Sequence, residues 1–374
     1  MIQPMNNKNA APSLHKPLNR PLRRGWTTGT CALAAMTAGY QAMMIGTFPN
    51  PVTVNLPGGQ HPCLALASKK KTKTYVEASI IKDAGDDPDV THGAEIIVRI
   101  ERGAENTGLI FKAGIGVGTV TLPGLMLAPG DAAINPSPRR MMKEAIYILA
   151  KAYNGPTDLI ITISIPNGEN IAKKTMNPRL GILGGLSILG TTGIVIPYSC
   201  SAWIHSINQG VDVAHAAGIT HLCAATGSTS EKTIERLFSP QPLAVIEMGD
   251  FAGGLLKYLR KHPLKKITLV GGFAKITKLS QGAVDLHSAR SSIDFSQLAE
   301  TFKSIGGCIT DAETVMHANT AKQVLDLSLQ LNLKLADRIA QQAARRATEL
   351  LDHVMDVEIV VIDRNGKVVG RHDE

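Results

Sequence analysis

The feature that most constrains the fold of this chain is the regular alternation of apolar runs with helix-forming segments after about residue 200. The apolar runs lie at 219–225, 243–247 and 266–271, and the helical segments at 202–216, 229–238 and 252–260. Strands separated by helices pair in parallel, because a parallel crossover needs a helix that covers the sheet. The pattern therefore predicts an α/β, Rossmann-like unit with a mostly parallel sheet covered on both faces.

Two longer helical segments and a hairpin complete this half of the sequence. The helices are expected at about 320–331 and 334–353, and the second carries an apolar stripe that ends at Leu350. The last apolar runs flank Asn365-Gly366, a pair typical of a tight hairpin turn. We therefore expect the C-terminal unit to span 196–374 and to include these helices and the hairpin.

The first half mixes helices with short strands. One helix is expected from Thr28 to about Ile45 with Thr27 or Thr28 as its N-cap, and another from a Ser137 cap to about Tyr153. Strand-like runs bounded by Gly, Pro or Asp lie at 52–56, 63–67, 74–82, 94–101 and 158–166. The sequence thus predicts an α+β domain over 21–195, preceded by a loose tail over 1–20.

Net charge limits the kind of partner. The formal charge is +8, but aromatic residues make up only 4% of the chain and no helix is densely basic, so surfaces for stacking nucleic-acid bases are scarce. The one compact basic run, Lys69–Lys71, is expected to be a solvated loop. The other basic residues lie beside glycine-rich turns, which favours a small polyanionic substrate over nucleic acid.

Cysteines and apolar runs limit the compartment. The chain has five cysteines and no Cys-x-x-Cys pair, so neither a zinc site nor a disulfide framework is expected. No run approaches the roughly 18 apolar residues that span a bilayer, and the N-terminus lacks the apolar core of a signal peptide. These features predict a cytoplasmic protein with no membrane span and no protein metal centre.

The expected carboxyl edge of the parallel sheet gathers glycines and acids. Ligands of open α/β sheets bind beyond the carboxyl ends of the strands, where glycine permits close backbone approach and a carboxylate can accept ribose hydroxyls. Both S-adenosylmethionine and a nicotinamide cofactor carry such a ribose, but the absence of G-x-G-x-x-G weakens the case for a pyrophosphate. The candidate cofactor-binding residues are Gly227, Ser228, Glu247, Gly249, Asp250, Gly271 and Gly272.

Candidate groups for an anionic substrate concentrate in loops of the first half. Hydroxyls at a helix start and arginines in a first helical turn suit an anion, although simple capping or solvation would explain the same residues. Arginine pairs with two carboxylate oxygens at once. The glycine-rich stretch 181–193 lies at the expected domain junction, where ligands often bind. The candidates are Thr27, Thr28, Arg139, Arg140, Lys174, Asn177, Arg179, Thr191 and Thr192.

An acidic turn between Lys82 and His92 is the candidate proton-handling group. Its spacing does not match an EF-hand, so calcium is not expected. Crowded carboxylates raise one another's pKa, which would let Asp86 or Asp87 accept a proton from a ligand. Ordinary Asx-turn chemistry explains the same cluster equally well.

Several motifs together resemble the CbiD family, the cobalt-precorrin-5B methyltransferases of cobalamin biosynthesis. They are Gly25–Ala32, Lys82–Thr91, Gly116–Gly124, Ala133–Arg139, Lys174–Gly181, Ser187–Ile194, Gly249–Phe251, Gly272–Leu279 and His287-Ser288. The resemblance covers nearly everything from about residue 21. The run Ala283–Asp285 before His287 departs from the family pattern and weakens a catalytic role for His287.

The resemblance implies methyl transfer from S-adenosylmethionine to carbon 1 of cobalt-precorrin-5B, giving cobalt-precorrin-6A. It places the methyl donor in the Rossmann-like half and the tetrapyrrole on the N-terminal loops, with cobalt carried by the substrate alone. The catalytic candidates are then Asp86, Asp87 and His287. A nicotinamide-dependent reductase of a corrinoid and a non-catalytic corrinoid carrier remain alternatives. Homo-oligomers and contacts with neighbouring pathway enzymes are compatible with each interpretation.

Overall fold

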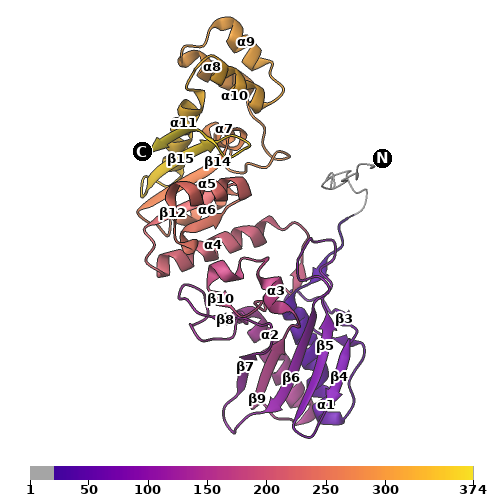
Figure 1. Ribbon diagram of the computed structural model, residues 1–374. Helices are drawn as coiled ribbons and strands as arrows, with labels where there is room; N and C mark the ends of the chain where they lie inside the picture. The colour runs from indigo at the N-terminus through magenta and orange to yellow at the C-terminus, as the bar shows by residue number, and fades with distance from the viewer. Residues whose placement is uncertain (1–20, 374) are drawn as a thin grey trace, which may run out of the picture.

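The computed structural model describes residues 21–373, and the predicted N-terminal tail lies outside that range. Two halves follow one another along the molecule, with helix α4 (Cys200–Ala216) running between them (Figure 1). Both halves combine helices with a sheet, and each sheet contains parallel pairs. The molecule is therefore a mixed α/β protein, as the alternation of strand-like and helix-forming segments in the sequence predicts.

The N-terminal half is built on a five-stranded sheet in the order β4-β5-β6-β9-β7. Its pairs are antiparallel except for β7 with β9. The strands span Ser68–Lys71 (β4), Tyr75–Ile81 (β5), Glu95–Arg102 (β6), Leu109–Ala113 (β7) and Leu159–Ser164 (β9). Helix α1 (Thr28–Ile45) packs on β5, β6 and α2 (Pro136–Tyr153), and it is buried on nearly every side as far as Tyr40.

Short elements surround this sheet. Two-residue strands pair as β1 (Gly25–Trp26) with β11 (Ile194–Val195), β2 (Val52–Thr53) with β3 (Cys63–Leu64), and β8 (Thr119–Val120) with β10 (Ile182–Leu183). Helix α3 (Gly168–Ala172) and the 3-10 turn η1 (Asn177–Leu180) lead into the glycine-rich stretch. The pair β1–β11 brings the start of the half next to its end.

Three sequence predictions for this half were wrong in detail. Lys69–Lys71 is not a loop but part of the exposed edge strand β4, where lysines protect a sheet edge from pairing with another chain. Helix α2 starts two residues earlier than expected, because Pro136 is its first residue and Asn135, not Ser137, is the N-cap. The runs at 52–56 and 63–67 form only two-residue strands. Strand β7 was not predicted.

The C-terminal half contains a five-stranded sheet in the order β13-β12-β14-β15-β16. The first four strands are parallel and β16 is antiparallel to β15, which confirms the alternating pattern and the hairpin. The strands span His221–Ala225 (β12), Val245–Glu247 (β13), Lys266–Gly272 (β14), Asp356–Ile362 (β15) and Val368–Asp373 (β16). After β12 the chain forms β13 on one side of it, and then crosses to form β14 on the other side. The direction of strand order therefore switches between β12 and β14.

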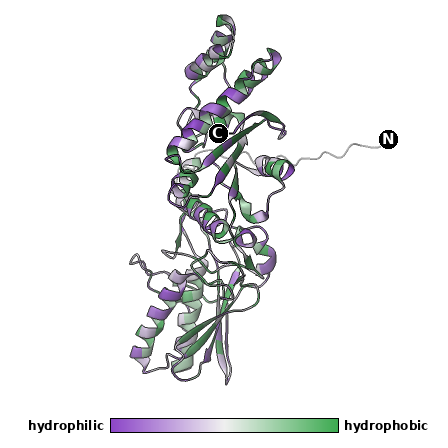
Figure 2. Ribbon diagram, turned by 90° about the vertical axis from the view of Figure 1, so that its left-hand side faces the viewer, coloured by the Kyte–Doolittle hydropathy of each residue, from purple (hydrophilic) through white to green (hydrophobic). Residues whose placement is uncertain are grey.

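Helices cover both faces of this sheet. Helix α5 (Ser228–Phe238) contributes Ile234 to a small core on one face, while α4, α6 (Ala252–Leu259), α7 (Phe273–Ser280) and α11 (Leu335–Leu350) build the large core on the other. The helices α8 (Phe295–Ser304), α9 (Ile309–Met316) and α10 (Ala321–Gln330) project beyond the sheet (Figure 1). Hydrophobic and hydrophilic residues alternate around these helices (Figure 2). Helices α7, α8 and α9 were not predicted.

The amino end of the sheet buries a network of charged groups. Glu358 is 1% exposed, and it accepts hydrogen bonds from Thr268 (2.9 Å) and Arg371 (2.6 Å) while Lys266 lies 3.1 Å away. His221 bonds Thr268 at 2.7 Å. Burying the Glu358 carboxylate costs free energy, and its hydrogen bonds and cations offset that cost only when all of them are present. A shift in strand register would break some of these contacts, so the network favours one register of β12, β14 and β15.

We expect the stability of this protein to fall as the pH drops below about 6.5, partly through His221. Burial lowers the pKa of His221 from 6.5, and the Lys266 ammonium lowers it further. The unfolded chain therefore binds a proton that the folded chain does not, so acid favours unfolding in this window. Melting temperatures at pH 5.5 and 7.5 should differ less in His221→Gln than in the parent. Exposed His317→Gln is the control, and an equal pH effect in all three proteins would contradict the assignment.

Candidate active site

The switch point of the C-terminal sheet lies between the carboxyl ends of β12 and β14. The Thr226 amide donates to the Val270 carbonyl at 3.1 Å, so the two strand ends stay together. A side chain at Gly271 would lie 2.8 Å from Ile276 and 3.0 Å from Thr226, whereas one at Gly272 would meet open space. Gly271 is therefore closely packed against two side chains, and Gly272 leaves the backbone accessible at the place where ligands of such sheets bind.

Gly227 and Ser228 lie at the start of α5, directly after β12. Gly227 is the N-cap and offers no side chain to the first turn. The first amides of a helix have no partner within it, so the Ser228 end of α5 presents donors and the positive end of the helix dipole. This edge can therefore receive a carboxylate or hydroxyl group.

Glu247 ends β13 and pairs in register with Ala225, which places its carboxylate beside the end of β12. Burial, and then the charge of Glu231, raise the pKa of Glu247 above its ordinary value, while the Arg179 guanidinium opposes them. Among the described residues, no hydrogen bond or ion pair engages the Glu247 side chain. Its carboxylate can accept hydrogen bonds from hydroxyl groups of a ligand.

Asp250 has a different environment. Lys275, in the first turn of α7, approaches the Asp250 carboxylate to 3.0 Å and donates to the Thr226 carbonyl at 2.8 Å. The lysine thus ties together the segments that follow β12, β13 and β14. Gly249 just before it adopts a φ of 57°, which suits glycine and turns the chain sharply after β13.

Arg179 links the two halves at this edge. It comes from η1 in the N-terminal half, and its two terminal nitrogens lie 2.5 and 3.2 Å from the two carboxylate oxygens of Glu231 in the first turn of α5. The hydrogen bond to Glu231 raises the pKa of Arg179. One residue predicted for the substrate therefore lies at the edge predicted for the cofactor.

A second link runs through the acidic turn. The Asp87 carboxylate accepts the Tyr198 amide at 2.8 Å, just before α4 begins. The Asp86 carboxylate accepts the Arg23 amide at 2.7 Å. Both acids therefore hold backbone segments that are distant in sequence, whereas the local Asx turns of this loop are made by Asp83 and Asp89, which accept the amides of Gly85 and Thr91. The role of Asp86 and Asp87 in proton transfer stays a prediction.

Comparison with known proteins places the chain. The family model described as CbiD matches residues 15–197, and the one described as CbiD, C-terminal domain, matches 285–373. A protein of Brucella anthropi named cobalt-precorrin-5B C(1)-methyltransferase is 52% identical over 98% of this chain and 100% of its own length. The chain belongs to the CbiD family. A Brucella canis protein of the same name is 51% identical over the same shares.

A solved structure from the same family is also similar. The crystal structure of the cobalamin biosynthesis protein CbiD from Archaeoglobus fulgidus shares 27% sequence identity, and the match covers 72% of this chain and 83% of that one with a TM-score of 0.40. Within residues 21–373 of this CbiD-family chain, no helix is long and apolar enough to cross a membrane. No group of three or more His, Cys, Asp or Glu side chains in that range could hold a metal ion.

The threonines at the start of α1 hold the glycine-rich stretch of this CbiD-family protein. Thr27 is the N-cap, as predicted, and Thr28 exchanges hydrogen bonds with the backbone of Leu189 at 2.9 and 3.2 Å. Both threonines are buried. Thr191 and Thr192 are exposed and lie in the loop that these bonds position.

The remaining basic and amide candidates divide into buried and open groups. Arg139 donates to the carbonyls of Ile134 and Ala132 at 2.8 and 3.0 Å, so its guanidinium is turned to the backbone. Asn177 is buried and bonds Gly185 and Ser187. Arg140 and Lys174 are exposed on the N-terminal half. Of these four candidates, only Arg140 and Lys174 present a cation outward, and the ion pair of Arg140 with Glu144 is long at 3.9 Å.

His287 is close to the carboxyl edge because the preceding residue, Leu286, is bonded to Asp250. The Leu286 amide donates to the Asp250 carbonyl at 2.8 Å, while His287 Nδ1 accepts the Ala289 amide at 3.1 Å. The ring therefore shapes a turn, and the catalytic role of His287 stays a prediction.

The sequence analysis assigned no role to Glu231 or Lys275. The signal available was a charged residue in the first turn of the helices that follow β12 and β14.

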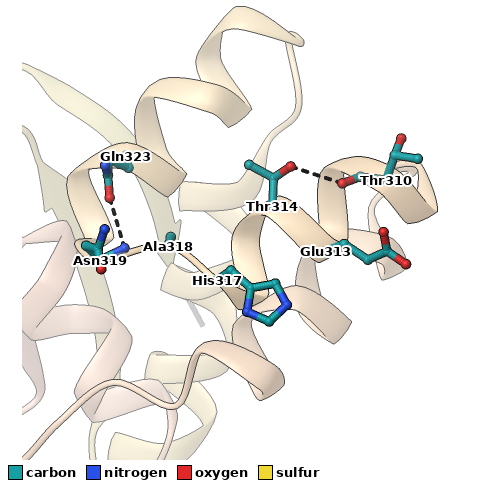
Figure 3. A pocket seen from close by; sticks show the side chains of 7 residues that line it. All are labelled: Thr310, Glu313, Thr314, His317, Ala318, Asn319 and Gln323. Atoms are coloured by element: carbon teal, nitrogen blue, oxygen red, sulfur yellow. Dashed lines mark hydrogen bonds between the residues drawn. The ribbon is translucent and has the colours of Figure 1, made fainter.

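A surface hollow lies in another part of the molecule. It has a volume of about 480 Å³ and is lined by residues of α9, α10 and the turn between them, among them Thr310, Glu313, His317 and Gln323 (Figure 3). These helices are at the end of the molecule away from the N-terminal half (Figure 1). The hollow is therefore separate from the strand ends described above.

Proposed function

We propose that this protein transfers the methyl group of S-adenosylmethionine to carbon 1 of cobalt-precorrin-5B, giving cobalt-precorrin-6A in the cytoplasm. Its full-length relatives carry the name of that reaction. The observation that carries the proposal is the ion pair between Arg179 and Glu231, because it joins a substrate-side loop to the edge that fits the donor. The N-terminal half, 21–195, would bind the tetrapyrrole, and a Rossmann-like unit, 196–374, the donor.

The residues present fit the methyl donor. Glu247 offers a partly buried carboxylate for the ribose hydroxyls, and the first amides of α5 after Gly227 offer donors for its carboxylate. Gly272 leaves room for close approach. When bound, the donor supplies an electrophilic methyl group on a sulfonium.

The chemical demand on the protein is then mainly one of position. A ring carbon that attacks the methyl in line needs alignment, which is worth up to about 7–11 kcal/mol in well-oriented cases. Arg140 and Lys174 would bind carboxylate arms of the ring, and Arg179 would fix the ring relative to the α5 edge. Thr191 and Thr192 would line the same loop. Cobalt arrives inside the substrate, held by the ring nitrogens.

The decisive experiment incubates the purified protein with cobalt-precorrin-5B and methyl-labelled S-adenosylmethionine. The ring should gain one labelled methyl group, and S-adenosylhomocysteine should appear in equal amount. An unchanged ring mass would instead support the corrinoid carrier. Calorimetric binding of NADPH, with no binding of S-adenosylmethionine or S-adenosylhomocysteine, would support the reductase and reject methyl transfer.

A further inference from the structure

Trp203 lies at the carboxyl edge of the C-terminal sheet, where no sequence motif drew attention to it. It is in the first turn of α4, and its amide donates to the Ser199 carbonyl at 3.3 Å. A Cβ placed on Gly249 would lie 3.6 Å from the indole Nε1 and 3.8 Å from Cε2 and Cζ2. The indole therefore lies against the turn that follows Glu247 by two residues.

The exposure of Trp203 has a geometric cause. Trp203, Ile207 and Val211 follow one another at four-residue spacing, so they share one stripe of α4. Ile207 and Val211 are 2% and 0% exposed in the large core, whereas Trp203 is 45% exposed. Because α4 leads into β12, it starts at the carboxyl end of the sheet, and Trp203, the first residue of the stripe, extends past the core.

Trp203 is a large, half-exposed aromatic ring that lies against Gly249, two residues after the Glu247 carboxylate, and this combination suits the base and ribose of a purine nucleoside. Ribose hydroxyls on Glu247 would bring the attached base toward Gly249, and the missing side chain of Gly249 leaves the indole accessible from that side. Aromatic side chains stack on bases of any kind because every base has a π-face. The charged groups nearby, Asp250 and Lys275, are already paired with each other.

We propose that Trp203 is a binding residue for the methyl donor and that its indole stacks on the adenine ring. This inference rests on the proposed function. It predicts that Trp203→Ala weakens S-adenosylhomocysteine binding by about fivefold, the lower part of the range for loss of base stacking. Trp203→Phe keeps an aromatic face and should stay within about twofold of the parent.

The chain contains only two tryptophans, Trp26 and Trp203, so fluorescence can test the contact directly. In Trp26→Phe, the remaining indole emission should change on titration with S-adenosylhomocysteine and saturate at the calorimetric Kd. In Trp203→Ala, where Trp26 is the only indole, the emission should not change. Melting temperatures of all variants establish that each is folded before titration.

Two results would overturn the inference while leaving methyl transfer intact. One is calorimetric binding of S-adenosylhomocysteine to Trp203→Ala with the parent affinity. The other is binding to Trp26→Phe without any change in emission. If S-adenosylhomocysteine did not bind the parent protein at all, both the proposed function and the adenine-binding role of Trp203 would be rejected.

Discussion

Replacing Glu247 with alanine should weaken S-adenosylhomocysteine binding about tenfold or more and leave tetrapyrrole affinity unchanged. A carboxylate that accepts two hydroxyl groups contributes charge-assisted hydrogen bonds, each stronger than a neutral one. The side chain ends β13 with no described partner, so its removal leaves no buried group unpaired. Titration calorimetry with each ligand in turn measures the two affinities.

The environment of Glu247 adds a pH test. Its pKa is raised, so protonation removes the charge at a higher pH than for an ordinary glutamate. Affinity for S-adenosylhomocysteine should fall as the pH is lowered into that range, and Glu247→Gln should bind weakly with no such dependence. Exposed Glu235→Ala on α5 makes the same change of net charge and is the matched control. Equal loss of both ligands in Glu247→Ala would contradict the division of the site.

Lys82→Ala should lower the free energy of unfolding by about 1–3 kcal/mol, the cost of leaving the partly buried Asp89 carboxylate, 24% exposed, without its cation. The Lys82 side chain is 2% exposed, and its ammonium lies 2.6 Å from the Asp89 carboxylate. Asp89 also accepts the backbone amide and the hydroxyl of Thr91 at 2.8 and 2.6 Å. Chemical denaturation measures the loss, and Lys70→Ala on the exposed strand β4 should change stability by less than about 0.5 kcal/mol.

Acid should shrink the difference between Lys82→Ala and the parent. Burial acts to raise the pKa of Asp89, but Lys82 and Thr91 outweigh it and leave the pKa below 3.8. In the parent, the stability contributed by this carboxylate is present above that value and lost as the pH falls through the lowered pKa. In the variant, the unpaired carboxyl can take up a proton earlier and so escapes part of its penalty. A difference that stays constant down to pH 3 would show that packing, not charge, explains the loss.

Local sequence signals predicted the parts of the fold that depend on periodicity and turn chemistry. The alternation after residue 200 predicted β12, β13 and β14 with their helices, and Asn365-Gly366 predicted the final hairpin. Strand β4 could not be predicted, because its lysines are explained only by its place at a sheet edge. The start of α2 was misplaced because two prolines compete for the first turn and only packing decides between them.

The residues of the candidate site likewise divide into those that the sequence predicts and those that it does not. Residues at strand ends, such as Glu247 and Gly272, followed from the parallel topology and lie together at one edge. Polar residues in the N-terminal loops could not be sorted into ligand-binding and structural groups, because their partners are distant in sequence. Arg139 bonds to nearby carbonyls, whereas Arg179 pairs with Glu231, 52 positions away. Trp203 had no motif around it, and only the end of the core beneath α4 makes it exposed.

Helix α4 has a consequence for how this protein can be divided. Its Ile207 and Val211 belong to the large core of the C-terminal half, while Val213 closes a small core with Val120 and Leu180 of the N-terminal half. The backbone at Gly124 also lies against Asp212, where an added Cβ would come within 2.6 Å of the carbonyl oxygen. A fragment that ends at 195 would lose one wall of its own interior, and the complementary fragment would expose Val213 to water. Shortened versions intended for crystallisation or binding studies should therefore keep this helix with both halves.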